Sequence, residues 1–178
     1  MTTEREMLDA LHRRYSARSQ ANTIRYAVAE FVRNAAGFDA TRTADFIAMD
    51  LWPRYGKGLE LHGHEVKVSR SDWLTELKDP TKAEAFKPWM DRWWLVAAED
   101  GIAKTTELPE GWGLLVLIGG RLRVARQAPR LDCQPMPKTM MAAFLRSVAA
   151  TADRLAREEV AKFADTLSRQ VEAMEATG

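Results

Sequence analysis

The pattern of apolar and polar residues along the chain predicts alternating helices and strands. Apolar positions recur at helical spacing from Met7 to Tyr15 and from Ile24 to Ala35, which indicates two N-terminal helices. Strands are expected at 44–51, 59–68 and 93–97, a hairpin at 114–125 and a long helix at 138–176. A helix capped by Ser71 or Asp72 is expected to run to about residue 90, with a restart at Asp79-Pro80. This order predicts a mixed α/β domain built on one central sheet.

The stretch 59–68 carries the most informative charges. Strand alternation places Glu65 and Lys67 on one face, with Val66 and Val68 toward the core. The two leucines at 59 and 61 share parity with the charged pair, so we expect a bulge or bend near Gly63. A carboxylate and an ammonium side by side at a strand end suit metal-assisted phosphate chemistry.

A second Glu-x-Lys sequence serves as a comparison. Glu76-Leu77-Lys78 lies in a stretch with helical spacing, where residues two apart diverge by about 200°. We therefore expect this second pair to be solvated at the surface. The first pair needs a carboxylate from a neighbouring strand, and Asp45 in the strand at 44–51 supplies one. His62 and His64 lie close by in sequence, but no cysteine or third histidine is placed to complete a zinc site.

Composition restricts the function classes only broadly. The 178 residues are 46% hydrophobic and 29% charged, which is ordinary for a globular domain. The net charge of +1 means that any nucleic-acid contact needs a local basic patch. The single cysteine fits a reducing compartment, and no stretch approaches the roughly 18 apolar residues of a membrane helix, so a cytoplasmic protein is expected.

The chain is expected to divide into three parts. Residues 1–128 form the α/β domain, residues 129–137 a linker and residues 138–178 a helical extension. The extension carries an apolar stripe whose members are three or four residues apart, which suits packing against another helix. That helix either belongs to the same domain or to a second copy in a homodimer. The first half of the stripe consists of Phe144, Val148, Ala152 and Leu155, and the second half, with this spacing, of Val160, Phe163, Leu167, Val171 and Met174.

Five segments together resemble a known family. The chain resembles the PD-(D/E)XK nuclease superfamily and is most similar to the MmcB-like DNA repair proteins of bacteria and phages. The resemblance covers about residues 24–128, and its most specific part is the run 65–72, Glu-Val-Lys-Val-Ser-Arg-Ser-Asp, combined with a Trp-Gly-Leu-Leu ending at 112–115. It implies a restriction-endonuclease-like core with a central mixed β-sheet flanked by helices. The carrying segments are 26–32, 44–48, 64–72, 91–96 and 108–115.

The resemblance also implies roles for individual residues. Asp45 and Glu65 match the metal ligands, helped by the Val66 carbonyl, and Lys67 matches the catalytic lysine. Glu30 matches an optional glutamate on the preceding helix, although a solvated surface glutamate is the alternative. The superfamily's Pro-Asp is Ala-Asp here, which is a common relaxation. The cofactor implied is Mg²⁺ or Mn²⁺.

The function implied is divalent-metal-dependent hydrolysis of DNA in repair, recombination or phage DNA processing. A catalytically silent DNA-binding module is one alternative, and a nuclease-like accessory subunit that docks a helicase or recombinase is another. Trp52, in a loop, is expected to stack on DNA. Basic residues expected to contact the DNA backbone are Arg42, Arg54, Lys57, Arg70 and Lys78.

Overall fold

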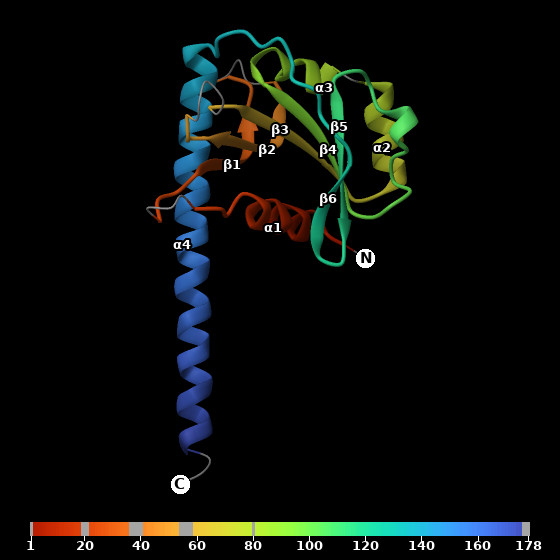
Figure 1. The fold of residues 1–178 in the computed structure, drawn as a ribbon. Helices are drawn as coiled ribbons and strands as arrows, with labels where there is room; N and C mark the ends of the chain where they lie inside the picture. Colours follow the sequence, from red (N-terminus) through yellow and green to blue (C-terminus); the bar gives the residue numbers. More distant parts are fainter. Residues whose placement is uncertain (1, 19–21, 36–40, 54–58, 80, 176–178) are drawn as a thin grey trace.

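A computed structural model of the chain describes residues 2–18, 22–35, 41–53, 59–79 and 81–175 (Figure 1). The described residues form a six-stranded sheet in chain order. Its strands are β1 (Tyr26–Arg33), β2 (Thr43–Asp50), β3 (Leu61–Lys67), β4 (Arg92–Ala97), β5 (Trp112–Ile118) and β6 (Arg121–Arg126). The helices are α1 (Glu4–Arg14), α2 (Arg70–Lys78), α3 (Thr81–Glu84) and α4 (Lys138–Glu175), with short 3-10 turns η2 (Lys87–Trp89) and η3 (Thr105–Glu107). None of the described helices is long and apolar enough to cross a membrane.

The sheet is mixed, as the sequence predicted. β1, β2 and β3 are antiparallel neighbours, whereas β3, β4 and β5 run parallel. β6 returns antiparallel to β5 through Gly119 and Gly120, whose φ values of 57° and 76° lie in the left-handed region. Two successive positive-φ residues make the tight hairpin turn that glycine permits without strain. The expected hairpin is therefore confirmed.

Helices cover both faces of the sheet. α1 packs on one face, where the Tyr15 hydroxyl contacts His64 and the His12 ring meets Phe46 edge-on. The other face is covered by α2 and by the segment that follows it. Trp73 of α2 packs against Trp112 there, and a stacked pair formed by Phe86 and Trp93 lies beside them. This arrangement confirms the expected α/β core with a central mixed sheet and flanking helices.

The second predicted helix is instead the edge strand β1. Residues 26–33 pair antiparallel with β2, from Tyr26 opposite Asp50 to Arg33 opposite Thr43, and the register is kept across Phe31, whose φ is 51°. The helical prediction was wrong because apolar spacing in a short segment fits both periods. Tyr, Val and Phe in this segment favour a strand, and pairing with β2 decides between the two. Glu30 therefore lies on a strand and not on a helix.

The expected bulge at Gly63 is absent from the ladder. β3 pairs in unbroken register with β4 from His62 to Lys67 and with β2 across Gly63 itself. The glycine has a steric reason instead, because a Cβ there would lie 2.3 Å from the Trp93 ring. Leu59 lies before the strand, with φ of 59° and half of its surface exposed. It therefore does not follow the alternation of β3, and no bulge is needed to bring it to the core.

The helical stretch predicted from about residue 71 to 90 is interrupted at the expected restart, and beyond it only the short elements α3 and η2 form. Ser69 caps α2, since its hydroxyl accepts a hydrogen bond from the Asp72 backbone N–H at 3.2 Å. The cap is therefore Ser69, where the sequence had suggested Ser71 or Asp72. α2 ends before Asp79, which precedes a proline and has φ of −133° and ψ of 79°. A residue before proline avoids the helical region, which explains the break before α3 and η2.

α4 is one helix of 38 residues, about 57 Å long at 1.5 Å per residue. Its first half runs along the outer edge of β1, where Met140, Phe144 and Thr151 are buried, and its second half extends well beyond the sheet (Figure 1). Packing of the stripe on its own domain is therefore confirmed for Phe144 and Val148 and wrong for the described residues of its second half. The Val171 side chain lies outside the description. The exposed fractions are 68% for Val160, 66% for Phe163, 45% for Leu167 and 75% for Met174.

Candidate active site

The ladder between β2 and β3 brings the predicted residues to one face of the sheet. Phe46 pairs with His64, so the preceding residue Asp45 and the following residue Glu65 both turn to the opposite face. Lys67 lies two residues further along β3 and shares that face. Asp45 stands near the start of β2 and Glu65 near the end of β3, and antiparallel pairing places these two ends together.

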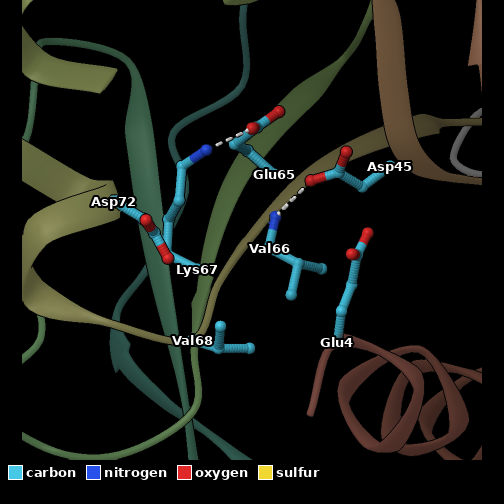
Figure 2. Close-up of a pocket in the computed structure, with 7 residues that line it drawn as sticks. All are labelled: Glu4, Asp45, Glu65, Val66, Lys67, Val68 and Asp72. Atoms are coloured by element: carbon cyan, nitrogen blue, oxygen red, sulfur yellow. Dashed lines mark hydrogen bonds and ion pairs between the residues drawn. The ribbon is translucent and has the colours of Figure 1, made fainter. Parts of the chain in front are cut away.

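Asp45, Glu65 and Lys67 line one cavity of about 230 Å³ (Figure 2). Val66 and Val68 of the same segment form part of its wall. Two further acids line the same cavity and were not foreseen from the sequence. They are Glu4, from the first turn of α1, and Asp72, from the first turn of α2. The cavity thus gathers four carboxylates around one ammonium group.

Asp45 is held by the backbone of the neighbouring strand. Its Oδ2 accepts a hydrogen bond from the Val66 N–H at 2.8 Å (Figure 2). An ionised carboxylate that accepts from a backbone amide is more tightly oriented than one on a flexible surface side chain. The contact therefore fixes the direction in which Asp45 faces the cavity.

Lys67 lies between two glutamates. Its Nζ is 2.6 Å from Glu65 Oε1 and 2.9 Å from Glu76 Oε2. The side chains are 12% exposed for Lys67, 1% for Glu65 and 9% for Glu76. Burial alone would lower the pKa of Lys67, but the charges and hydrogen bonds of the two carboxylates outweigh it and raise the pKa. The amine is therefore an ammonium at neutral pH and acts as a positive charge, not as a base.

The prediction that Glu76 is solvated was wrong. α2 docks through the buried Trp73, and this orientation turns Glu76 toward Lys67. One carboxylate oxygen, Glu76 Oε1, is buried and has no hydrogen-bond partner among the described residues. Asp72 and Glu76 stand four residues apart and therefore share a side of α2. Their spacing of four residues was the signal in the sequence that Glu76 faces the same way as Asp72. Lys78 is exposed, as expected.

Glu30 faces away from this cavity. It pairs with Phe46, so it belongs to the face covered by α1. Its carboxylate accepts hydrogen bonds from Arg5, His12 and Arg154 at 2.6 to 3.0 Å. Burial would raise the pKa of Glu30, but the bonds from His12 and Arg5 and the charges of Arg5 and Arg154 lower it to about 2. The structure thus makes Glu30 a junction between α1, β1 and α4 and separates it from Asp45 and Glu65.

The predicted DNA-contacting residues do not form one free basic patch. Arg70 is neutralised by Glu107, with nitrogen–oxygen distances of 2.5 and 2.7 Å. Arg42 lies 3.4 Å from Asp79. Trp52 is half-buried, with the Arg25 guanidinium 5.9 Å from its ring centroid. Arg54 and Lys57 lie outside the described residues.

The two histidines near the motif are structural. His64 is fully buried on the α1 face, with Nε2 at 2.9 Å from the Tyr15 hydroxyl and Nδ1 at 3.3 Å from the Phe46 carbonyl oxygen. His62 lies within 3.3 Å of the Trp94 indole N–H. Burial lowers the pKa of both rings, so both are neutral at pH 7. Neither faces Asp45 and Glu65, because both belong to the opposite face of β3.

The donor set determines which ion suits the cavity. Among the described residues, no group of three or more histidine, cysteine, aspartate and glutamate side chains is arranged to hold a metal ion. A cage of three or more such side chains around one ion is therefore not formed among the described residues. Mg²⁺ is usually bound through one or two carboxylates and completes its shell with water and phosphate oxygens. Asp45, Glu65 and the Val66 carbonyl fit that smaller requirement.

Comparisons with known proteins identify the fold and leave the activity open. No family model matches the chain, and no curated protein matches it. A solved structure is similar to it, that of SPO1766, a protein of unknown function from Silicibacter pomeroyi. The two chains share 18% identity with a TM-score of 0.57, over 87% of this chain and 90% of that chain. At this identity the likeness concerns the fold alone.

Proposed function

We propose that the protein is a divalent-metal-dependent DNA nuclease of the PD-(D/E)XK type, acting in DNA repair, recombination or phage DNA processing in the cytoplasm. One observation carries the proposal. Asp45, Glu65 and Lys67 come from adjacent strands, share one face and line one cavity. This arrangement depends on the register between β2 and β3. A shift of one residue in either strand would have turned one carboxylate to the opposite face of the sheet.

Each residue has a defined part in the proposed reaction. Asp45 and Glu65 would hold Mg²⁺ or Mn²⁺ together with the Val66 carbonyl. The ion supplies Lewis-acid polarisation of the scissile phosphate and a lowered pKa for an attacking water. The Val66 N–H orients Asp45, and the buried setting of Glu65 excludes bulk water from its side of the cavity.

Lys67 contributes charge at the reacting phosphate. Its raised pKa keeps it protonated, so it donates hydrogen bonds to a phosphate oxygen as negative charge develops. Glu76 holds the ammonium from the α2 side, independently of Glu65. The lysine is thus positioned before substrate arrives, and little reorganisation is needed during the reaction.

A panel of labelled DNAs tests the proposal. Duplex, nicked, flapped, forked and single-stranded substrates are incubated with Mg²⁺, with Mn²⁺ and with a chelator. We expect metal-dependent cleavage of at least one substrate, abolished in Asp45→Asn and retained in Glu99→Gln, which changes an exposed carboxylate. The two variants are purified identically, so equal cleavage by both would reveal a contaminating nuclease and contradict the proposal.

A catalytically silent DNA-binding or accessory subunit is the second candidate. It is favoured by one feature, since Glu65 Oε1 is already engaged by Lys67 at 2.6 Å and an ion would have to compete for that carboxylate. Such a subunit would bind DNA without cleaving any member of the panel. An accessory role with a helicase or recombinase would use the exposed half of α4 as its docking surface. Binding without turnover, under all metal conditions, would select this candidate over the nuclease.

A further inference from the structure

The arginines of the described chain fall into two groups. Most are paired with carboxylates, as Arg5 is with Glu30, Arg25 with Asp50 and Arg92 with Glu60. Arg13, Arg14 and Arg121 form no ion pair with any described carboxylate, and all three are exposed. The net charge of +1 conceals this difference, because the paired arginines cancel locally, whereas Arg13, Arg14 and Arg121 are unpaired arginines that the fold brings together.

These three arginines meet in one groove. It has a volume of about 460 Å³ and lies between the last turn of α1 and the turn that joins β5 to β6. Arg13 Nη2 donates to the Gly120 carbonyl at 3.4 Å, and the Arg14 guanidinium lies 5.9 Å from the Trp94 ring centroid. The groove is lined by Ala10, Arg13, Arg14, Gly120, Arg121 and Leu122, and we call it the arginine groove.

The arginine groove has the chemistry of a phosphate site. A guanidinium presents a planar fork of N–H donors that matches phosphate oxygens, and three such groups without counter-ions favour an anion between them. The glycine turn leaves the rim open, because a Cβ added at Gly119 or Gly120 would meet nothing within 4 Å. A polyanionic backbone can therefore approach the groove closely.

α1 connects the arginine groove with the candidate active site. Its first residue, Glu4, lines the cavity of Asp45 and Glu65, and its last turn carries Arg13. Nine residues at 1.5 Å per residue separate the two by about 14 Å along the helix axis. That length equals roughly four base pairs of duplex at 3.4 Å each.

We infer that the arginine groove binds the phosphate backbone of duplex DNA, about four base pairs from the bond that the active site would cut. This inference rests on the proposed function for its substrate, and it replaces the patch around Arg42 and Arg70, whose charges are paired. It also assigns α1 a second task besides covering the sheet, as the element that spaces the groove from the cavity.

The test compares two double variants that remove the same charge. Arg13→Gln with Arg121→Gln alters the groove, and Arg157→Gln with Arg169→Gln alters exposed arginines on α4 that pair with aspartates. Binding of a labelled 20-base-pair duplex is measured in Ca²⁺ buffer between 50 and 200 mM salt. We expect the groove variant to lose about tenfold or more in affinity and to reduce the slope of log K against log salt by about two. The α4 variant should change neither quantity.

The outcomes separate this inference from the proposed function. Equal binding by both variants overturns the groove assignment, even if the wild type cleaves DNA. A groove-specific loss of binding in a protein that never cleaves supports the groove and rejects the nuclease. A wild type that binds no duplex contradicts both. Tighter binding of an RNA duplex of the same sequence would overturn the assignment to DNA.

Discussion

At the scale of single residues, the candidate site depends on where one ammonium group lies. Glu65 and Glu76 are both largely buried, and two carboxylates this close to each other require a cation. Lys67 is that cation, which gives it a structural task besides any catalytic one. Because Lys67 also neutralises Glu76, its removal is expected to lower stability as well as activity.

Changing Lys67 to Ala should therefore affect both cleavage and folding. We expect DNA cleavage to fall by about 100-fold or more, the scale of losing one transition-state electrostatic group. The free energy of unfolding should fall by roughly 1–3 kcal/mol, because the change leaves two largely buried carboxylates without their cation. DNA binding in Ca²⁺ should persist, since most affinity comes from many phosphate contacts. Cleavage assays, urea unfolding and a binding titration measure the three effects.

Lys78→Ala is the matched control, because it removes the lysine of the second Glu-x-Lys sequence, which is exposed at the end of α2. It should leave cleavage within a few-fold and unfolding within about 0.5 kcal/mol. Equal losses from the two substitutions would show that the Glu65-Val66-Lys67 motif is not the catalytic centre.

At the scale of secondary-structure elements, Glu30 joins three parts of the fold. Its carboxylate binds Arg5 and His12 of α1 and Arg154 of α4, and its backbone N–H donates to the Thr151 hydroxyl at 3.0 Å. The last contact satisfies an outward-facing amide of the edge strand β1. An uncovered edge strand is a site for unwanted pairing, so α4 also protects the sheet.

The pKa of Glu30 gives this junction a defined pH dependence. The pKa is about 2 in the folded protein, against about 4.3 for an unfolded glutamate. The stabilisation is therefore present above about pH 4.3 and is lost as the pH falls toward 2. Glu30→Gln should destabilise the protein by about 2 kcal/mol at pH 7, and this difference from wild type should shrink at pH 3.

Urea unfolding at both pH values measures the effect of Glu30→Gln, with Glu159→Gln on the exposed part of α4 as the control. The control should match wild type at each pH. A destabilisation by Glu30→Gln that is the same at pH 7 and pH 3 would show that the carboxylate charge is not what the junction uses.

The sequence predicted those elements whose signal is local. β2, β3 and β4 follow from their apolar patterns, and the glycine pair specified the β5–β6 turn. Asp45, Glu65 and Lys67 were found because strand alternation determines which side chains share a face. Other features depend on how elements dock. The strand conformation of β1 is determined by its pairing with β2, which lies outside the segment itself. Glu76 reaches Lys67 only because Trp73 orients α2. Arg70 is neutralised by Glu107, which lies 37 residues away.

At the scale of the whole molecule, charge is distributed unevenly despite a net value of +1. Carboxylates gather at the candidate active-site cavity, whereas unpaired arginines gather at the other end of α1. A bound duplex would meet attraction at the groove and repulsion at the cavity unless cations screen the acids. We therefore expect duplex binding, as well as cleavage, to require a divalent ion.

α4 is the largest feature that the domain does not use. From residue 159 onward its described side chains are exposed, so this half of the helix lacks the tertiary packing that supplies most of the stability of helices in proteins. Its apolar residues form one stripe at spacings of three, four and seven: Val160, Phe163, Leu167 and Met174. Such a stripe gains most from a partner helix of the same pattern. We therefore propose that two copies of the chain pair through this half of α4.

Replacing Phe163 and Leu167 by Glu should separate the two copies. Light scattering after gel filtration should give twice the chain mass for wild type and the chain mass for this variant, because burial of two carboxylates in the seam is unfavourable. Melting of the α/β domain should be unchanged, since neither residue contacts it.

Ala161→Glu with Ser168→Glu adds the same charge away from the stripe and should remain dimeric. A wild type that is monomeric at high concentration would contradict the proposed dimer. A dimeric Phe163→Glu/Leu167→Glu variant would show that the interface lies elsewhere.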